Sequence, residues 1–127
     1  MLNKNPILED FQKATKRLGE VLKLKKTKIV RDSAIKRFEL CFDLSWKSVK
    51  SIARINGIEC YSPRECFKTA FQLKLISHDE RWLEMIEDRN LTTHLYKENQ
   101  ANKVYRKLPR YLEMFQNLLF EIKRNLQ

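Results

Sequence analysis

The sequence has few residues that interrupt helices or form tight turns: two glycines and three prolines among 127 residues. This composition leaves little room for flexible linkers or hairpin turns. Cysteine is also scarce, and Cys41, Cys60 and Cys66 are odd in number and form no C-x-x-C pair. We therefore expect neither the disulfide framework of a secreted protein nor a zinc site.

Long apolar runs are missing as well. No run approaches the roughly 20 residues of a membrane span, and the first six residues lack the apolar core of a signal peptide. The chain has no Gly-rich phosphate loop and no clustered metal ligands. These absences predict a cytoplasmic protein, free of membranes, that holds no metal or cofactor of its own. The length fits a single domain over 1–127, long enough to bury a core.

Positive charge is abundant and unevenly distributed. The formal net charge is +10, and residues 1–54 hold fourteen Lys or Arg against six Asp or Glu. Residues 78–98 are acidic instead, with six Asp or Glu against three Lys or Arg. A basic field of this kind favours a polyanion or an acidic partner protein. The alternative is a well-solvated helical surface with a basic bias.

The apolar pattern has the period of amphipathic helices throughout the chain. Residues 6–24 carry one apolar stripe, and Pro6 suits a first helical turn. Residues 29–55 form the longest stretch without a breaker, and their apolar residues cover more than one stripe. Burial on two sides would follow, with the core on one side and a subunit interface on the other.

The second half of the chain predicts further helices. Ser62-Pro63-Arg64-Glu65 is a capping signature that begins one helix. A short helix should run from Trp82 into the segment that follows, and a last one should cover about 99–125, where Pro109 should kink or split it. No segment alternates with period two. The expected fold is all-α, an up-and-down bundle of four to five helices.

Residues 89–96, Arg-Asn-Leu-Thr-Thr-His-Leu-Tyr, concentrate side chains that carry chemistry. Arg89 is a forked cation suited to phosphate oxygens, and His94 can exchange a proton near neutral pH. On an unbroken helix, residues five apart are rotated by roughly 140° and would not share a face. A bend at the β-branched Thr92 and Thr93, or a symmetric dimer, could still bring the two side chains together.

These residues could cleave a phosphodiester without a metal. His94 would serve as the base or acid, Arg89 would stabilise the transition-state oxygens, and Asn90 would orient the phosphate or the imidazole. The alternative is structural: Arg89 pairs with Glu87, Asp88 or a helix end, and His94 is a surface histidine. Spacing does not decide between them.

Three blocks resemble the HEPN domains, specifically the nucleotidyltransferase substrate-binding subunits. Residues 37–47 read RFELCFDLSWK and are similar to that family's R-F-E-x-x-F-E-L-x-W-K, with Asp43 in place of the usual Glu. The second block is Ser62-Pro63-Arg64-Glu65 with Ala70-Phe71 and Leu75-Ile76. The third is residues 82–96, WLEMIEDRNLTTHLY. The blocks occur in the family's order between about 37 and 101.

The resemblance implies a helical homodimer that works with a cognate minimal nucleotidyltransferase. In the related toxins the Arg and His of an R-x4-6-H motif cleave RNA without metal at the dimer interface, which implies catalytic roles for Arg89 and His94, with Asn90 assisting. The R-x4-H-x-Y pattern further implies that the partner, using its own ATP and Mg²⁺, transfers AMP to Tyr96 and silences the ribonuclease.

Three functions remain open at this point. The first is a ribonuclease toxin of a two-component toxin–antitoxin system. The second is a non-catalytic subunit that binds a nucleotide substrate for the nucleotidyltransferase, and the third is a structural dimer that stabilises its partner. Trp46 and Phe42 could stack on a nucleotide base, or could simply belong to the core.

Overall fold

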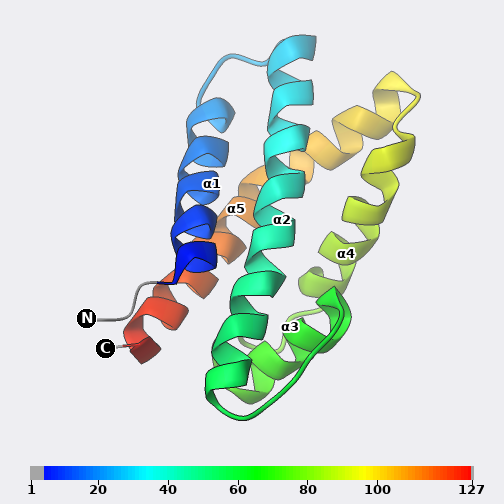
Figure 1. Ribbon diagram of the computed structural model, residues 1–127. Coiled ribbons are helices and arrows are strands. Elements are labelled where there is room, and N and C mark those ends of the chain that lie inside the picture. The colour runs from blue at the N-terminus through cyan, green and yellow to red at the C-terminus, as the bar shows by residue number, and fades with distance from the viewer. Residues whose placement is uncertain (1–4, 127) are drawn as a thin grey trace.

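The computed structural model describes residues 5–126 and contains five α-helices and one 3-10 turn in that range. The predicted all-α bundle of four to five helices is confirmed (Figure 1). The elements are α1 (Pro6–Leu22), α2 (Lys28–Ile55), α3 (Pro63–Gln72), α4 (Arg81–Leu91), the turn η1 (Thr92–His94) and α5 (Glu98–Leu126).

Side-chain caps explain where the first three helices begin. Asn5 accepts a hydrogen bond from the backbone N–H of Leu8, and Thr27 accepts one from Val30. Ser62 accepts from the N–H of Glu65, as the capping signature predicts. Each cap satisfies a backbone donor that the first helical turn leaves free and contributes about 1 kcal/mol.

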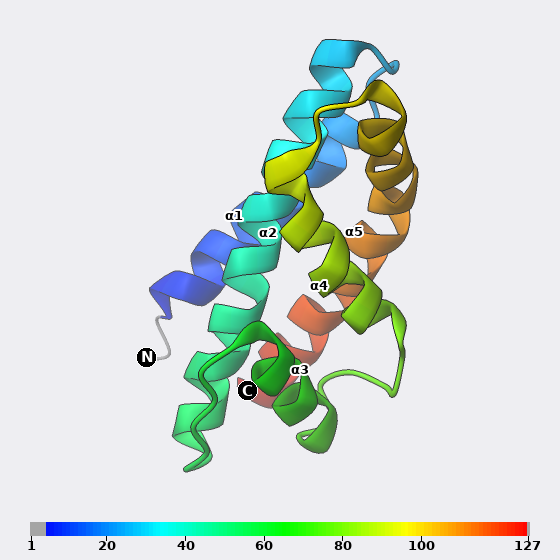
Figure 2. The ribbon, with the colours of Figure 1, turned by 90° about the vertical axis from the view of Figure 1, so that its right-hand side faces the viewer.

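The core lies along α2, which packs against α1, α5 and α3. Figures 1 and 2 show the long helices α1, α2 and α5 side by side, with α3 and α4 completing the bundle. Aromatic rings form the centre: Phe11, Phe38, Phe42, Phe67, Trp82, Tyr111 and Phe115. Each large apolar side chain buried there contributes about 2 kcal/mol, so the bundle forms a rigid frame for the polar end that α4 and η1 build.

Pro109 does not split the last helix, contrary to one of the two outcomes expected from the sequence. It lies within the single helix α5, and its ring is exposed. Proline removes one backbone hydrogen bond and crowds the preceding turn, which bends a helix toward the side away from the ring. Figure 2 shows that α5 changes direction along its length, and a proline inside a helix is a common cause of such a bend.

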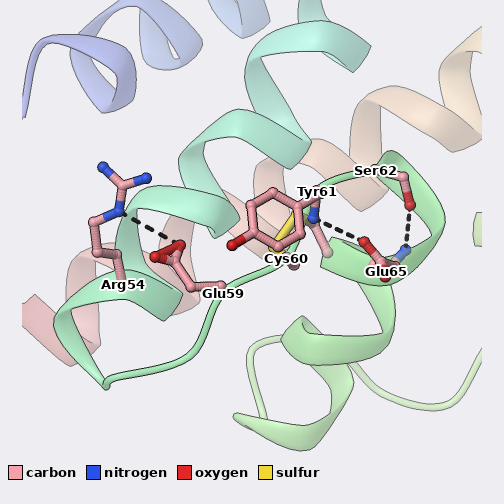
Figure 3. Close-up of a disulfide and its surroundings, with 7 residues drawn as sticks. Arg54, Glu59, Cys60, Tyr61, Ser62 and Glu65 are labelled. Atoms are coloured by element: carbon pink, nitrogen blue, oxygen red, sulfur yellow. Dashed lines mark hydrogen bonds and ion pairs between the residues drawn. A yellow bond between two sulfur atoms is a disulfide. The ribbon is translucent and has the colours of Figure 1, made fainter.

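Cysteine pairing is the clearest difference from the sequence-based expectation. Cys60 and Cys66 form a disulfide between the α2–α3 connection and the first turns of α3 (Figure 3). The pair is missed because it depends on how this connection folds back onto α3, and a six-residue spacing does not encode that. Cys41 is free and buried, and its burial raises the pKa of the thiol to about 12.

None of the helices described in residues 5–126 combines the length and the apolar character that a membrane span requires.

Candidate functional site

The predicted motif lies at one end of the bundle, where α4 gives way to the turn that leads into α5 (Figure 2). Arg89 is in the last turn of α4, which ends at Leu91. Thr92–His94 then form a 3-10 turn. The helix therefore ends between Arg89 and His94, so the rotation that would separate them on a continuous helix does not apply.

Arg89 points from α4 to two carboxylates on α2. Its Nη1 lies 3.1 Å from Oε2 of Glu39, and its Nη2 lies 3.5 Å from Oδ2 of Asp43. Its side chain is 23% exposed. The acidic partners considered from the sequence, Glu87 and Asp88, do not hold it: residues 50 and 46 positions away do.

The Nε–H of Arg89 is buried and has no hydrogen-bond partner; among the described residues only the Ser48 hydroxyl shares that condition. A buried donor without a partner costs about 1–3 kcal/mol. That donor is closed to solvent, so a ligand would meet only the part of the side chain that is exposed. Two carboxylates therefore position the Arg89 fork, together with the Thr92 hydroxyl, 3.2 Å from Nη1, and part of the side chain stays exposed.

His94 and Tyr96 lie together on the exposed side of the turn. The Nδ1 of His94 is 3.3 Å from the Tyr96 hydroxyl oxygen, and both side chains face solvent. Tyr96 is 84% exposed, more than any other large hydrophobic side chain described. An imidazole reachable by solvent can exchange a proton with a substrate, and the phenol beside it is open to chemical modification.

The segment carrying His94 and Tyr96 is held at both ends by α2. At one end the Thr92 hydroxyl lies 2.6 Å from Oε2 of Glu39. At the other end Glu98 accepts hydrogen bonds from Arg31, and that pairing lowers the pKa of the Glu98 carboxyl. A cavity of about 300 Å³ lies along this segment and is lined by Arg31, Thr92 and Tyr96, among others.

Asp88 has a structural role next to Arg89. It is buried and accepts hydrogen bonds from the Tyr111 hydroxyl at 2.6 Å and from Nζ of Lys107 at 3.1 Å, both on α5. Burial, together with the bond to Asp88, raises the pKa of Tyr111. Asp88 thereby joins α4 to α5 on one side, while Arg89 reaches α2 on the other.

The structure therefore brings Arg89, Thr92, His94 and Tyr96 to one end of the molecule, and Asn90 is exposed beside them. No hydrogen bond or ion pair joins Arg89 to His94 within the described chain. The sequence analysis missed Glu39 and Asp43 as partners of Arg89. The available signal was their i, i+4 spacing, which puts both on one face of a helix.

A second feature lies near the middle of the chain. A cavity of about 520 Å³ lies between the end of α3 and α5. Its lining combines Trp82 with the guanidinium groups of Arg81 and Arg110. Metal ligands do not gather in residues 5–126: no three His, Cys, Asp or Glu side chains come close enough to hold an ion.

Comparison with known proteins places this geometry in context. Residues 7–124 match a family described as nucleotidyltransferase substrate binding protein like. A structure from Thermus thermophilus is 33% identical, with a TM-score of 0.83, and the alignment covers 88% of this chain and 98% of that one.

Two similar proteins come from Haemophilus influenzae. One, named "Probable ribonuclease HepT", is 27% identical over 108 residues, which is 78% of this chain and 74% of the relative. The other is a structure described as revealing the fold of a substrate binding domain of a nucleotidyltransferase. It is 22% identical, with a TM-score of 0.78 over 91% of this chain and 98% of that one, and shows the shared fold.

Proposed function

The chain belongs to the nucleotidyltransferase substrate-binding family of HEPN proteins, and on that premise we propose that it is a metal-independent endoribonuclease. The protein would be the toxin of a two-component system in which a minimal nucleotidyltransferase is the antitoxin. The observation that carries the proposal is the partly exposed Arg89 fork, held by Glu39 and Asp43, at the same end of the bundle as the exposed imidazole of His94.

Cleavage would use the 2′-hydroxyl of the RNA as the nucleophile. His94 takes the proton from that hydroxyl while its oxygen attacks the adjacent phosphorus. Arg89 donates hydrogen bonds to the phosphoryl oxygens as negative charge builds up on them, and Asn90 orients the phosphate. The 5′-oxygen leaves with a proton supplied by an imidazolium, and the products are a 2′,3′-cyclic phosphate and a 5′-hydroxyl.

A homodimer would complete the site by placing a second imidazole across from the first. Two large apolar side chains next to the site support a covering partner. Leu40, adjacent to Glu39, is 50% exposed, and Leu91, two residues after Arg89, is 54% exposed. A two-fold axis near these residues would bury them and bring the base of one chain and the acid of the other to one phosphate.

Control of the enzyme would operate through Tyr96. The cognate nucleotidyltransferase, with its own ATP and Mg²⁺, would transfer AMP to the phenol oxygen and release pyrophosphate. The Tyr96 oxygen is 3.3 Å from His94, so the adduct would set a bulky, negatively charged group against the imidazole. Its phosphate would also compete with RNA for Arg89.

A second candidate is the non-catalytic subunit that binds a nucleotide for the nucleotidyltransferase. The cavity of about 520 Å³ near Trp82 favours it, because an aromatic wall with Arg81 and Arg110 suits a base and a phosphate. Arg81 is already occupied, however, because it donates three side-chain hydrogen bonds to Asp79.

The deciding experiment is cleavage of single-stranded RNA by the purified protein in excess chelator. The wild type should cleave, and Arg89→Ala and His94→Ala should each lose about a hundredfold or more in rate. Circular dichroism should show both variants folded. Absence of cleavage in the wild type, combined with saturable nucleotide binding, would support the second candidate instead.

A separate experiment tests the modification. Incubation with the partner, ATP and Mg²⁺ should add one or more AMP masses, found by intact mass spectrometry, and inhibit cleavage. Tyr96→Phe should abolish both effects, and Tyr61→Phe, a control at another exposed tyrosine, should abolish neither. An adduct retained in Tyr96→Phe would place the modification elsewhere.

A further inference from the structure

The second half of α2 presents positive charge and aromatic rings on its outer side. We define the basic aromatic face as Trp46, Lys47, Lys50 and Arg54 of α2 together with Tyr61 of the following connection. A hollow of about 340 Å³ lies on this face, lined by Trp46, Lys47, Lys50 and Arg54 with contributions from Ile7 and Ser51. The proposed function leaves this surface without a role.

Charge on the face is nearly unopposed. Within residues 5–126 these three cations pair with one carboxylate, Glu59, whose Oε1 lies 3.6 Å from Nε of Arg54. Both partners of that pair are largely exposed, so solvent weakens it. Figure 3 shows Arg54, Glu59 and Tyr61 on the same side of the α2–α3 connection.

Each aromatic ring on the face has a lysine over it. Nζ of Lys47 is 5.9 Å from the centre of the Trp46 ring, and Nζ of Lys50 is 5.3 Å from that of Tyr61. Tyr61 is 68% exposed and Trp46 is half-buried, whereas Phe42 belongs to the core. Rings that stack on bases, next to cations that contact phosphates, are the chemistry of single-stranded nucleic acid binding.

The face is continuous with the candidate site along one side of α2. Glu39, Asp43, Lys47, Lys50 and Arg54 follow one another at steps of three or four residues, which places them on one face of the helix. From Asp43, which holds Arg89, to Arg54 the helix rises by about 16 Å, the span of a few nucleotides.

We propose that the basic aromatic face binds the single-stranded RNA that flanks the scissile phosphate, an inference that rests on the proposed ribonuclease function. Trp46 and Tyr61 stack on unpaired bases, and Lys47, Lys50 and Arg54 neutralise the phosphates between them. The protein therefore selects single-stranded over double-stranded RNA, because paired bases do not offer their faces.

The test measures binding apart from cleavage. The probe is a fluorescent single-stranded oligonucleotide with 2′-O-methyl sugars, which cannot undergo attack by the 2′-hydroxyl. Lys47→Glu/Lys50→Glu should bind it about tenfold more weakly than the wild type and should lower the slope of log affinity against log salt by about one. The matched control is Lys13→Glu/Lys16→Glu, which makes the same charge change on exposed residues of α1 and should stay within about twofold.

Trp46 provides a second readout. The chain has two tryptophans, and Trp82 is only 6% exposed. Stacking should quench the fluorescence of Trp46, so Trp46→Phe should remove the quenching while near-ultraviolet circular dichroism shows the fold unchanged. A matched RNA duplex should bind at least tenfold more weakly than the single strand.

Several outcomes would overturn the inference. Equal losses of affinity in the two lysine double variants would show that the protein attracts RNA only through its overall positive charge. Quenching that persists in Trp46→Phe would show that Trp46 does not stack on a base. Tighter binding of a polyglutamate peptide than of the oligonucleotide would identify an acidic protein as the occupant. The two proposals can fail separately. If the wild type binds the oligonucleotide as expected but cleaves no RNA, the ribonuclease proposal is wrong and RNA binding by this face still holds.

Discussion

Arg31 and Arg89 are two arginines that join α2 to neighbouring elements, and they use their donors differently. Arg31 is 6% exposed, and its nitrogens donate to Asp32, Glu98 and Asn102. The bonds to Glu98 and then Asp32 raise its pKa further above the ordinary value. Arg89 is 23% exposed, has longer contacts to its carboxylates and leaves its buried Nε–H without a partner.

The comparison separates an arginine that holds the fold from one that is set up to receive a ligand. A buried, fully bonded fork can accept a new oxyanion only by giving up short hydrogen bonds, whereas a partly exposed fork with longer contacts can do so at a lower cost. The two arginines should therefore respond to mutation in opposite ways, one through stability and the other through activity.

The largest expected effect is on cleavage. Arg89→Lys keeps the positive charge, but a lysine ammonium lacks the fork that donates to a carboxylate and a phosphate at the same time. We therefore expect the RNA cleavage rate to fall by about 10- to 100-fold. Arg31→Lys should stay within about twofold of the wild type. Single-turnover cleavage in chelator measures the rate of each variant. Similar losses of rate in the two variants would show that Arg89 and Arg31 do not differ in their roles.

Stability should show the reverse order. Arg31→Ala removes the link between α2 and the start of α5 and should lower the free energy of unfolding by about 2 kcal/mol. Arg89→Ala should cost less than about 1 kcal/mol, because one buried donor already lacks a partner. Urea unfolding followed by circular dichroism gives both values; a larger loss in Arg89→Ala would make it the structural residue.

A smaller effect sharpens the role of the carboxylates that hold Arg89. Glu39→Gln should bind RNA a few-fold more tightly, because one negative charge is removed, and should lower kcat about fivefold, because Arg89 is less well oriented. Glu87→Gln makes the same charge change on an exposed residue of α4 and serves as the control. A fall in KM without any change in kcat would show that Glu39 opposes binding and positions nothing.

The smallest effect is a pH dependence at the Arg31 link. The pKa of Glu98 is lowered in the folded state from an ordinary value of 4.5, chiefly by its hydrogen bond to Arg31. Glu98 therefore stabilises the fold above about pH 4.5, and this contribution is lost as the pH falls through its lowered pKa. Glu98→Gln should be less stable than the wild type at about pH 7 and equally stable at about pH 2. Urea unfolding at the two pH values checks this, and a gap that persists in acid would refute it.

Much of the fold could be predicted because its signals are local. The stripes over 6–24, 29–55 and 99–125 gave helices that end within a few residues of those in the structure, and Ser62 caps α3 as expected. The composition and period of the apolar residues decide these features, and both are visible along the chain. Pro109 was misjudged in part because packing of α5 against the core outweighs the cost of the lost hydrogen bond.

The candidate site could be predicted only as a set of residues. The motif named Arg89, Asn90, His94 and Tyr96, and their roles stay predictions. What the chain does not reveal is which groups face Arg89, because Glu39 and Asp43 lie far away in sequence and meet it only when α4 packs beside α2. The Cys60–Cys66 disulfide was missed for a similar reason: a folded loop brings the sulfurs together.

The short segment between Thr92 and Glu98 is held to α2 at both ends, and these contacts limit how the segment can move. A segment fixed at both ends cannot move away as a unit when a group is added to a side chain in its middle. A group attached to Tyr96 must either turn about its own side-chain bonds or break one of the two contacts with α2. The Arg31–Glu98 pair is more exposed than the Thr92–Glu39 contact. Only a group that cannot turn in this way would disturb the Arg31–Glu98 pair and, through it, the first turn of α5.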